Sequence, residues 1–440
     1  MELWRKCGTY LEARAQLGLF NTADRIEQGS FRMKLEAIEV RRDDLRIGVL
    51  PSSSLPRILI LTVLAVMAAI STYVGVKEAA FSDPATEGID FQWSGAHLLS
   101  QHENPWKLYI EHKDQGKIIL GQQPNYLAEL FLILWPLGRM SFQDAVIWWC
   151  GCNLAFAGGI IYVVRRMFSL DRDHTLLVAF LLMASTPFRV TLHIGQHSLF
   201  VLMMLCLAIF PRNLALRGLA LGLSYGKYSF APVIVLMLLV KRRVGLVLIS
   251  IIPPLAGLLV AWSLLGGSLW TLALEPLAVA RMAMGPGHGD IMTFTEELLR
   301  KLPISPSLIF SVPSALGLLA AAAGAILIGR SRRMNDNLQF AVALILTLVC
   351  LKHVMYDFVV LVVPVAAAVM APKSKSRVIV LLCALHFWFL SPIIHHIFSA
   401  QRVNALEVLT YAVLLLVMAI AASRLYPAPN LDAKPVLAAQ

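Results

Sequence analysis

The sequence has few charged residues for its length. Only 15% of its 440 residues are Asp, Glu, Lys or Arg, whereas 58% are hydrophobic. A soluble protein of this size needs far more polar side chains to cover its surface. Because the hydrophobic residues are spread along the chain, the composition also argues against a large separate soluble domain. We therefore expect an all-α polytopic membrane protein.

Cysteine is scarce as well, and the few cysteines form no recognisable site. Five of the six lie in or beside apolar segments, where a thiol acts as a small hydrophobic group. Cys150-Gly-Cys152 has neither the spacing nor the companion ligands of a zinc site. We expect neither a disulfide framework nor a structural metal.

The first 56 residues lack the apolar core of a cleavable signal peptide and mix basic with acidic groups. We expect 1–56 to be a cytoplasmic tail, 57–425 to be a transmembrane catalytic domain, and 426–440 to be a second cytoplasmic tail. The net charge of +11 is typical of basic cytoplasmic loops in a membrane protein. The expected partners therefore include membrane lipids but no nucleic acid.

Apolar runs long enough to cross or nearly cross a bilayer recur along the chain. The run 218–240 is interrupted by Ser-Tyr-Gly-Lys-Tyr-Ser-Phe-Ala-Pro, so we interpret it as two half-spans. The stretch 117–138 is interrupted by Gly-Gln-Gln-Pro-Asn-Tyr, and we expect it to dip without crossing. The expected spans are 57–77, 143–164, 174–187, 197–211, 218–240, 244–265, 304–328, 338–351, 354–370, 378–392 and 404–423.

Clusters of Lys and Arg orient these spans, because basic loops stay in the cytoplasm. Placing every cluster inside gives about twelve crossings, in a range of roughly 10 to 13, with both termini inside. Amphipathic helices are expected in the outer loops, including one that starts near Thr293. The expected outer loops are 78–142, 188–196, the turn around Lys227, 266–303, the turn near Lys352, and 393–403.

The first long outer loop carries a candidate general base. Asp90, Trp93, Ser94 and His97 have the spacing i, i+3, i+4 and i+7 of one helix face. A carboxylate held just outside the hydrocarbon is suited to take a proton from an attacking hydroxyl. The alternative is a solvated acid at a helix N-terminus, stabilised by the helix dipole.

Glu129 lies within the apolar segment 127–138. An acid there is costly unless it faces the protein interior or water, which favours a functional role. A structural ion pair is an equally open alternative.

The segment 187–200 joins two spans and carries several polar side chains. His193 and His197 have the i, i+4 spacing of a metal pair, but no acid lies between them as in a His-Glu-x-x-His motif and no third ligand is near. We therefore expect helix capping and hydrogen bonds to a substrate from Arg189, Gln196 and His197 instead of metal binding.

Lys227 lies at the tip of the expected broken helix. Interrupted membrane helices are tolerated where their backbone lines a cavity, and such cavities bind substrates. A cation at this position suits a phosphate. The alternative is a lysine whose side chain extends to the membrane surface.

The segment Lys352-His-Val-Met-Tyr-Asp357 lies between two later spans. His353, Tyr356 and Asp357 are at i, i+3 and i+4, so they share a helix face. A cation and an imidazole beside the membrane favour an anionic head group as the ligand.

Taken in order, these features resemble a known family. They are an N-terminal span, an Asp-aromatic motif with Asn-Pro-Trp, a Pro/Tyr stretch before Trp-Pro-Leu, a Gly-Gln pair between spans, the Lys-x-x-x-x-Pro break and a late His-x-x-Tyr-Asp. Together they resemble the integral-membrane glycosyltransferases of family 87. This family includes bacterial polyprenol-phosphate-mannose-dependent α-1,2-mannosyltransferases, and it belongs to the GT-C fold.

The resemblance implies a GT-C-like bundle in the bacterial plasma membrane. It implies transfer of a hexose, mannose by family default, from a polyprenyl-phosphate donor to a lipid or glycan acceptor at the outer (periplasmic) face, with inversion. No metal or other cofactor is implied. Asp90 takes the place of the general base, and Lys227, His353, Lys352 and Arg189 are the candidates to hold the donor phosphate. Sugar or acceptor contacts are then expected from Trp93, His97, Tyr126, Glu129, Gln196, His197, Tyr356 and Asp357.

One departure from the family concerns the loop before Trp-Pro-Leu. The family often has Tyr-Pro-Pro where this chain has Gln-Pro-Asn-Tyr, so that Pro124 and Tyr126 occur in altered order. This leaves the donor sugar and the acceptor open.

Two other functions remain compatible with the residues. A transporter or flippase of lipid-linked sugars would explain the broken helix and Glu129, but not two long outer loops, and the sequence has no clear inverted repeat. A ligase-type polymerase of surface polysaccharide would use similar lipid-linked substrates.

Overall fold

The computed structural model describes residues 54–81, 91–113, 116–118, 123–283, 287, 289–391 and 405–426. The chain divides into two units, Met1–Gly48 and Val49–Gln440, and all the described residues belong to the second. The expected tails 1–56 and 426–440 and the outer loop 393–403 therefore lie wholly or almost wholly outside the described residues, as does Asp90.

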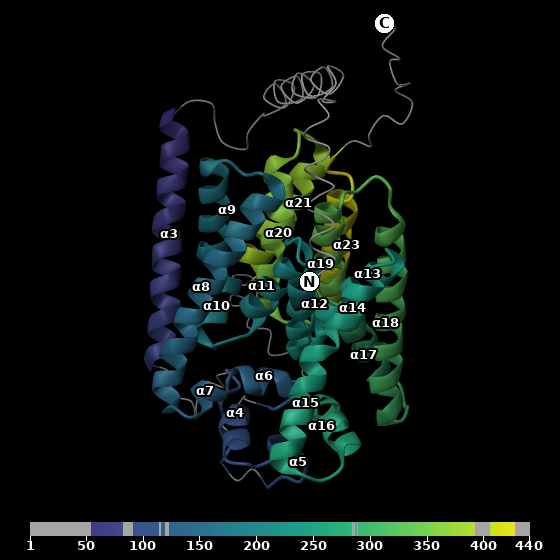
Figure 1. Cartoon of the computed structure of the whole chain (residues 1–440). Coiled ribbons are helices and arrows are strands. Elements are labelled where there is room, and N and C mark those ends of the chain that lie inside the picture. Colours follow the sequence, from purple (N-terminus) through teal and green to yellow (C-terminus); the bar gives the residue numbers. More distant parts are fainter. Residues whose placement is uncertain are drawn as a thin grey trace, which may run out of the picture. The chain divides into compact units, whose positions relative to one another are not determined.

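All regular elements of the described residues are helical, as the composition predicted (Figure 1). The first half of the chain forms α3 (Ser54–Phe81), α4 (Trp93–Ser100), α5 (Pro105–Ile110), α6 (Ala128–Ile133), α7 (Trp135–Gly138), α8 (Phe142–Phe168), α9 (Arg172–Ala184), α10 (Thr186–His193), α11 (Ser198–Ile209) and α12 (Leu214–Leu223). The second half forms η1 (Ser224–Phe230), α13 (Ala231–Val240), α14 (Val244–Ser250), α15 (Ile252–Leu265), α16 (Leu269–Ala283), α17 (Ile291–Leu299), α18 (Pro306–Arg330), α19 (Asp336–Cys350), η2 (Met355–Leu361), α20 (Val362–Met370), α21 (Lys375–Leu385), η3 (His386–Leu390) and α23 (Ala405–Ala422).

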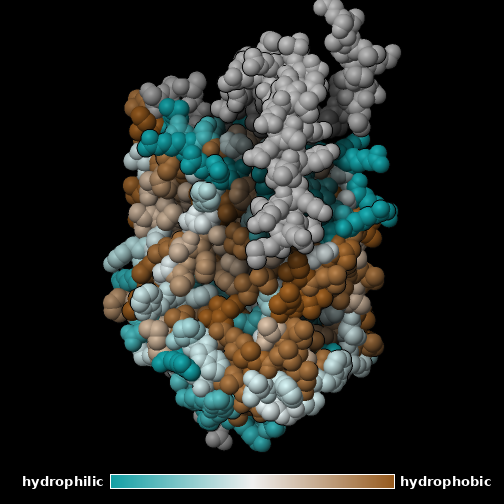
Figure 2. All heavy atoms as spheres, in the orientation of Figure 1, coloured by the Kyte–Doolittle hydropathy of each residue, from teal (hydrophilic) through white to brown (hydrophobic). Residues whose placement is uncertain are grey.

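Many large hydrophobic side chains are exposed on the surface of these helices, which would be unfavourable in water. On α3, the side chains of Leu59, Val63 and Ile70 are 63%, 50% and 58% exposed. Figure 2 shows hydrophobic residues over a broad middle band, with hydrophilic residues gathered towards both ends of the visible face. Exposed apolar surface of this extent marks a lipid interface, so the fold is that of a multi-pass membrane protein.

Full-length spans are fewer than the sequence predicted. Six helical runs of the described residues are long and apolar enough to cross a bilayer, or seven if the bent pair α9 and α10 forms one span. One of the six, Leu214–Val240, contains the break at Lys227. About twelve crossings were expected. The difference arises because α11, α19 and the pair η2–α20 are shorter apolar helices that end at turns rich in polar residues.

The helix predicted to break at Lys227 is a hairpin of half-spans formed by α12, η1 and α13. Lys227 has φ −111° and ψ 81°, which interrupts the helix. A straight helix over Leu214–Val240 would be about 40 Å long. Yet the Leu214 side chain lies 3.9 Å from where a Cβ on Gly245 would be, and Gly245 follows α13 after a short turn. Both ends of the run therefore lie at the same membrane face.

Several basic clusters gather at one end of the helices. Asp336 at the start of α19 accepts hydrogen bonds from Lys241 and, at 3.1 Å, from Arg243. Asn337 donates to the carbonyl of Met167 at the end of α8, at 2.7 Å. The short helices α4, α5 and α7, together with α16, lie at the other end (Figure 1). This grouping agrees with a topology in which the basic loops lie at one end of the helices and the long loops at the other.

The stretch 117–138 forms no span, as predicted. Its described part contains only the short helices α6 and α7. α6 packs closely on α15, because a Cβ on Gly257 would lie 2.7 Å from the backbone nitrogen of Glu129. α7 packs as closely on α4, where Gly138 meets the backbone of Ala96. The loop helices thus form a layer against the end of the span α14–α15.

Candidate active site

Lys227 lies where the broken helix turns, and its side chain is only 11% exposed. Its ammonium donates to the carboxylate of Asp357, to Ser198 Oγ at 3.1 Å and to Gln196 Oε1 at 3.4 Å. The centroid of the Tyr356 ring lies 4.7 Å from the ammonium nitrogen. The side chain is therefore held inside the protein, and the alternative of a lysine extended to the membrane surface is wrong.

A second turn, between α10 and α11, supplies two of these partners. Gly195 has φ 67°, a conformation that favours glycine. Its carbonyl accepts a hydrogen bond from Trp149 Nε1 at 2.8 Å, which fixes the turn against α8. The chain then enters α11 with Gln196 and Ser198 directed at Lys227.

A third turn, between α19 and η2, supplies the acid. Asp357 is 1% exposed. Its Oδ1 accepts a 2.5 Å hydrogen bond from Ser198 in addition to that from Lys227. Its Oδ2 lies 2.9 Å from His353 Nδ1 and accepts from the backbone of Val354 at 3.4 Å. His353 and Asp357 therefore lie together, as their i, i+4 spacing predicted.

Three segments far apart in the sequence thus meet at one buried ion pair. An ammonium, an imidazole and a hydroxyl lie within one network around Asp357. Charged and neutral donors converging in a dry site form strong hydrogen bonds to an anion. An anion that enters this network competes with Asp357 for Lys227, which the structure already holds in place.

Two of the cations expected at the phosphate lie outside this network. Lys352 pairs with Glu296 on α17, and the two side chains are 8% and 13% exposed. Arg189 lines a different pocket of about 220 Å³, together with α3 residues such as Met67 and Val74. The structure therefore brings Lys227 and His353 together but leaves Lys352 and Arg189 in other surroundings.

The outer-loop helix α17 packs against the third turn. It begins after Asp290, whose Oδ1 accepts from the backbone of Thr293 at 2.7 Å. The expected start near Thr293 is therefore wrong by most of a turn, because Asp290 is the cap. Burial raises the pKa of Asp290 to about 7. Six residues after Asp290, Glu296 pairs with Lys352, so the helix is tied to the segment that carries His353.

The two histidines with metal-pair spacing lie apart. His193 ends α10 and lies 3.5 Å from Glu78 on α3. His197 is fully buried, with its ring centroid 5.1 Å from that of Trp149 and 5.4 Å from that of Tyr126. The helix ends between them, so they do not share a face. Across the described part of the chain, no three His, Cys, Asp or Glu side chains are grouped as metal ligands would be.

Trp93 and His97 hold two loop helices together. Their rings stack with centroids 4.5 Å apart. Trp93 donates to the carbonyl of Leu137 at 3.1 Å, and His97 Nδ1 lies 2.7 Å from the carbonyl oxygen of Gly138. The helix starts only at Trp93, after Gln92 with φ 64°. Of the expected helix face, the described residues Trp93, Ser94 and His97 lie on this helix, and Asp90 lies outside the described residues.

Glu129 on α6 is 4% exposed, and neither of its carboxylate oxygens has a hydrogen-bond partner among the described residues. The structural ion pair is therefore not formed there. Burial raises the pKa of Glu129 to about 7. Its neighbour Leu130 packs on η1, where a Cβ on Gly226 would lie 3.3 Å from Leu130 Cβ. The unpaired acid thus lies on the element that covers the break at Lys227.

The sequence pattern missed two residues of this region. Ser198 was not among the candidate residues, although it directly follows Gly-Gln-His within the expected span 197–211. A hydroxyl at the first position after such a turn was the signal. Glu296 lies in the amphipathic helix that was expected to start near Thr293, and nothing in the sequence connects it to Lys352.

Comparison with known proteins gives a family. The family model for glycosyltransferase family 87 matches residues 130–392. No curated protein and no solved structure matches the chain. The matched segment includes Lys227, His353 and Asp357, but it begins after Asp90 and Tyr126. Because the match covers more than half of the chain, the protein belongs to glycosyltransferase family 87 and is a membrane glycosyltransferase.

Proposed function

We propose that the protein transfers a hexose, mannose by family default, from a polyprenyl-phosphate donor to a lipid or glycan acceptor. The observation that carries the proposal is the meeting of three turns at Lys227. A buried ammonium with an adjacent imidazole and hydroxyl suits the phosphate of a lipid whose tail lies in the bilayer. The donor phosphate binds at Lys227 and His353.

The proposed entry of the phosphate is based on the hydrogen bonds of Lys227. An ammonium has three hydrogens, and those of Lys227 are directed at Gln196, Ser198 and Asp357. The contact to Gln196 is the longest, at 3.4 Å, and hydrogen bonds weaken with distance. A phosphate oxygen replaces this contact first, while Gln196 Oε1 keeps its hydrogen bond from the backbone of His197.

The reaction is a single displacement with inversion. The acceptor hydroxyl oxygen attacks the anomeric carbon while the bond from that carbon to the phosphate oxygen breaks. The electron pair of the broken bond stays on the phosphate, where Lys227 and His353 stabilise it. Asp90 takes the hydroxyl proton as the general base. The acceptor is held at the end of the fold that carries the long loops, which we place at the outer face of a bacterial plasma membrane.

Sugar transfer is tested with the full-length protein in lipid nanodiscs, given polyprenyl-phosphate mannose and a membrane-lipid extract as the acceptor source. Release of polyprenyl phosphate is measured in wild type, in Lys227→Met and in the matched control Lys241→Met. Lys241 lies at the other end of the same hairpin, beside Asp336. We expect Lys227→Met to lower the rate at least about 100-fold and Lys241→Met to leave it unchanged.

The same preparation separates transfer from transport. In proteoliposomes, a flippase would move intact donor lipid across the bilayer without releasing polyprenyl phosphate. Equal rates in the two lysine variants, or movement of the donor without cleavage, would overturn the proposed function.

A further inference from the structure

A second polar cavity lies among the loop helices, away from the Lys227 network. It has a volume of about 660 Å³ and is lined by the α4–α5 turn with α5 and by the α15–α16 turn with α16. We call it the loop pocket and define it by Asn104, Lys107, Trp270, Thr271 and Glu275. Its volume is in the range of pockets that hold an organic ligand, far larger than an ion requires.

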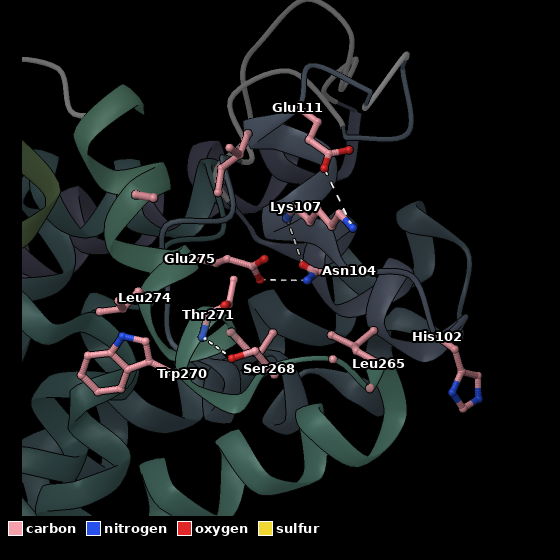
Figure 3. A pocket seen from close by; sticks show the side chains of 15 residues that line it. His102, Asn104, Lys107, Glu111, Leu265, Ser268, Trp270, Thr271, Leu274 and Glu275 are labelled. Atoms are coloured by element: carbon pink, nitrogen blue, oxygen red, sulfur yellow. Dashed lines mark hydrogen bonds and ion pairs between the residues drawn. The ribbon is translucent and has the colours of Figure 1, made fainter.

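Two glycines and a capping asparagine build this pocket. Gly266 and Gly267 have φ 70° and 78°, which lets the chain reverse between α15 and α16. Asn104 caps α5 by accepting from the backbone of Lys107 at 3.0 Å. Its amide donates across the pocket to Glu275 Oε2 at 2.8 Å. Figure 3 shows Asn104 and Glu275 meeting between the two walls, with Trp270 and His102 at opposite sides of the view.

The polar groups that line the pocket are suited to hydrogen bonds with hydroxyl groups of a ligand. Among the described residues, Glu275 Oε1 and the Thr271 hydroxyl have no hydrogen-bond partner, and one amide hydrogen of Asn104 is also unused. A sugar hydroxyl both donates and accepts, so it pairs with each of these groups. Trp270 is 73% exposed at the rim and offers a flat apolar surface to a sugar ring.

The charge of the pocket does not favour the donor phosphate as its ligand. One lysine, Lys107, faces two acids, Glu111 and Glu275. Burial raises the pKa of Glu275, although the hydrogen bond from Asn104 and the charge of Lys107 act in the opposite direction. A neutral polyhydroxyl ligand is therefore preferred over an anion.

Packed residues connect the pocket to the candidate active site. Trp106, two positions after Asn104, is fully buried and donates to the carbonyl of Tyr126 at 3.1 Å. The ring of Tyr126 packs on His197, which precedes Ser198 of the Lys227 network. The Asn-Pro-Trp sequence thus links the pocket wall to the turn beside Lys227.

We propose that the loop pocket binds the carbohydrate part of the acceptor. Neutral sugar rings lie against Trp270, and their hydroxyls bond to Glu275, Asn104 and Thr271. This inference rests on the proposed glycosyl transfer and deepens it, because it specifies an acceptor that carries sugar rings.

Sugar binding is tested without turnover, on the full-length protein in nanodiscs. The probe is a neutral trisaccharide, either α-1,2-linked mannotriose or maltotriose, and the readout is saturation-transfer NMR. We expect binding in wild type and a roughly tenfold weaker affinity in Trp270→Ala and in Glu275→Ala. Trp148→Ala is the matched control, because Trp148 is also exposed, at 62%, but lies on α8 outside the pocket. Equal binding in all four proteins would overturn the inference, as would the absence of binding in wild type.

The transfer assay separates this inference from the proposed function. If both are correct, Trp270→Ala and Glu275→Ala raise the KM for the acceptor roughly tenfold and leave the KM for the donor unchanged. Transfer with an unchanged acceptor KM overturns the loop pocket and keeps the function. No transfer in wild type, with trisaccharide binding that the two variants lose, overturns the function and keeps the carbohydrate pocket.

Discussion

Glu129 is a buried carboxyl group without a bonding partner among the described residues. Such a group costs folding free energy, because its charged form loses hydration without a compensating bond. Residues kept at such a cost often serve a function that a stable replacement would lose. Its position on α6, above η1, places that function near the site at Lys227.

Replacing Glu129 by Gln tests this cost. The pKa of Glu129 is raised from 4.5 to about 7, so the folded protein binds more protons than the unfolded chain between these values. Stability therefore falls as pH rises through this window, by at most about 3 kcal/mol. We expect Glu129→Gln to raise the Tm of the purified protein at pH 8 but not at pH 4.5, and to lower activity.

The control for that comparison is Glu103→Gln, an exposed acid paired with Lys117. It should leave the pH dependence of the Tm as in wild type. A Tm difference between Glu129→Gln and wild type that is the same at both pH values would contradict the assignment.

Asp357 and Lys227 are expected to depend on each other for stability. Removing one partner of a buried pair leaves an uncompensated charge and costs about 3–5 kcal/mol. Asp357→Asn should therefore lower the Tm strongly, although the side chain keeps its shape. The double variant Asp357→Asn/Lys227→Met should recover part of the loss, because it has no unpaired charge. Additive losses in a double-mutant cycle would show that the two side chains do not interact.

At this scale, the sequence located Lys227, Gln196, His353 and Asp357 as candidates because each interrupts an apolar run. It assigned them to separate turns and could not show that they bond to one another. Their partners are distant in the chain, and periodicity reports only local neighbours. The family resemblance implied that Asp357 contacts the sugar or the acceptor, and in the structure Asp357 accepts a hydrogen bond from Lys227.

At the scale of elements, the break in the α12–α13 hairpin was predictable because Gly, Ser and Pro interrupt the apolar run around Lys227. The short lengths of α11 and α19 were not predictable, because an apolar run has the same composition whether its helix crosses the membrane or ends inside it. The start of α17 was misplaced because a Thr and an Asp are both good caps, and only tertiary packing chooses between them.

The contact between α6 and α15 is an element-scale test of how the site is covered. A side chain at Gly257 would meet the backbone nitrogen and Cα of Glu129 at 2.7 and 2.8 Å, so the two helices must separate. We expect Gly257→Val to lower the Tm and to reduce transfer by displacing α6 from η1.

Gly151→Val is the matched control in another membrane helix, because a Cβ at Gly151 meets no atom within 4 Å. It should leave both the Tm and transfer unchanged. Equal effects of the two substitutions would mean that α6 does not depend on its close approach to α15.

At the scale of the whole molecule, composition and basic clusters were sufficient to predict a multi-pass helical membrane protein. They predicted about twelve crossings, whereas six or seven helices of the described residues are long and apolar enough to cross a bilayer in full. The polar tips of half-length helices then became outer loops in the prediction. In the structure those tips meet in one buried network.

Asp90 remains a prediction at this scale. It lies outside the described residues and before the segment that matches family 87. Its proposed role rests on the resemblance and on the loop helices that follow it. The role requires Asp90 to reach the sugar on the side opposite the phosphate at Lys227.

The most direct test of the central claim is the position of the donor phosphate. It is measured by electron cryomicroscopy of the full-length protein in nanodiscs with a non-cleavable polyprenyl-phosphate mannose analogue. We predict the phosphate within hydrogen-bond distance of the Lys227 ammonium, with the sugar on the side of the loop helices. A phosphate bound at Arg189 between α3 and α10, with the Lys227–Asp357 network undisturbed, would contradict the account.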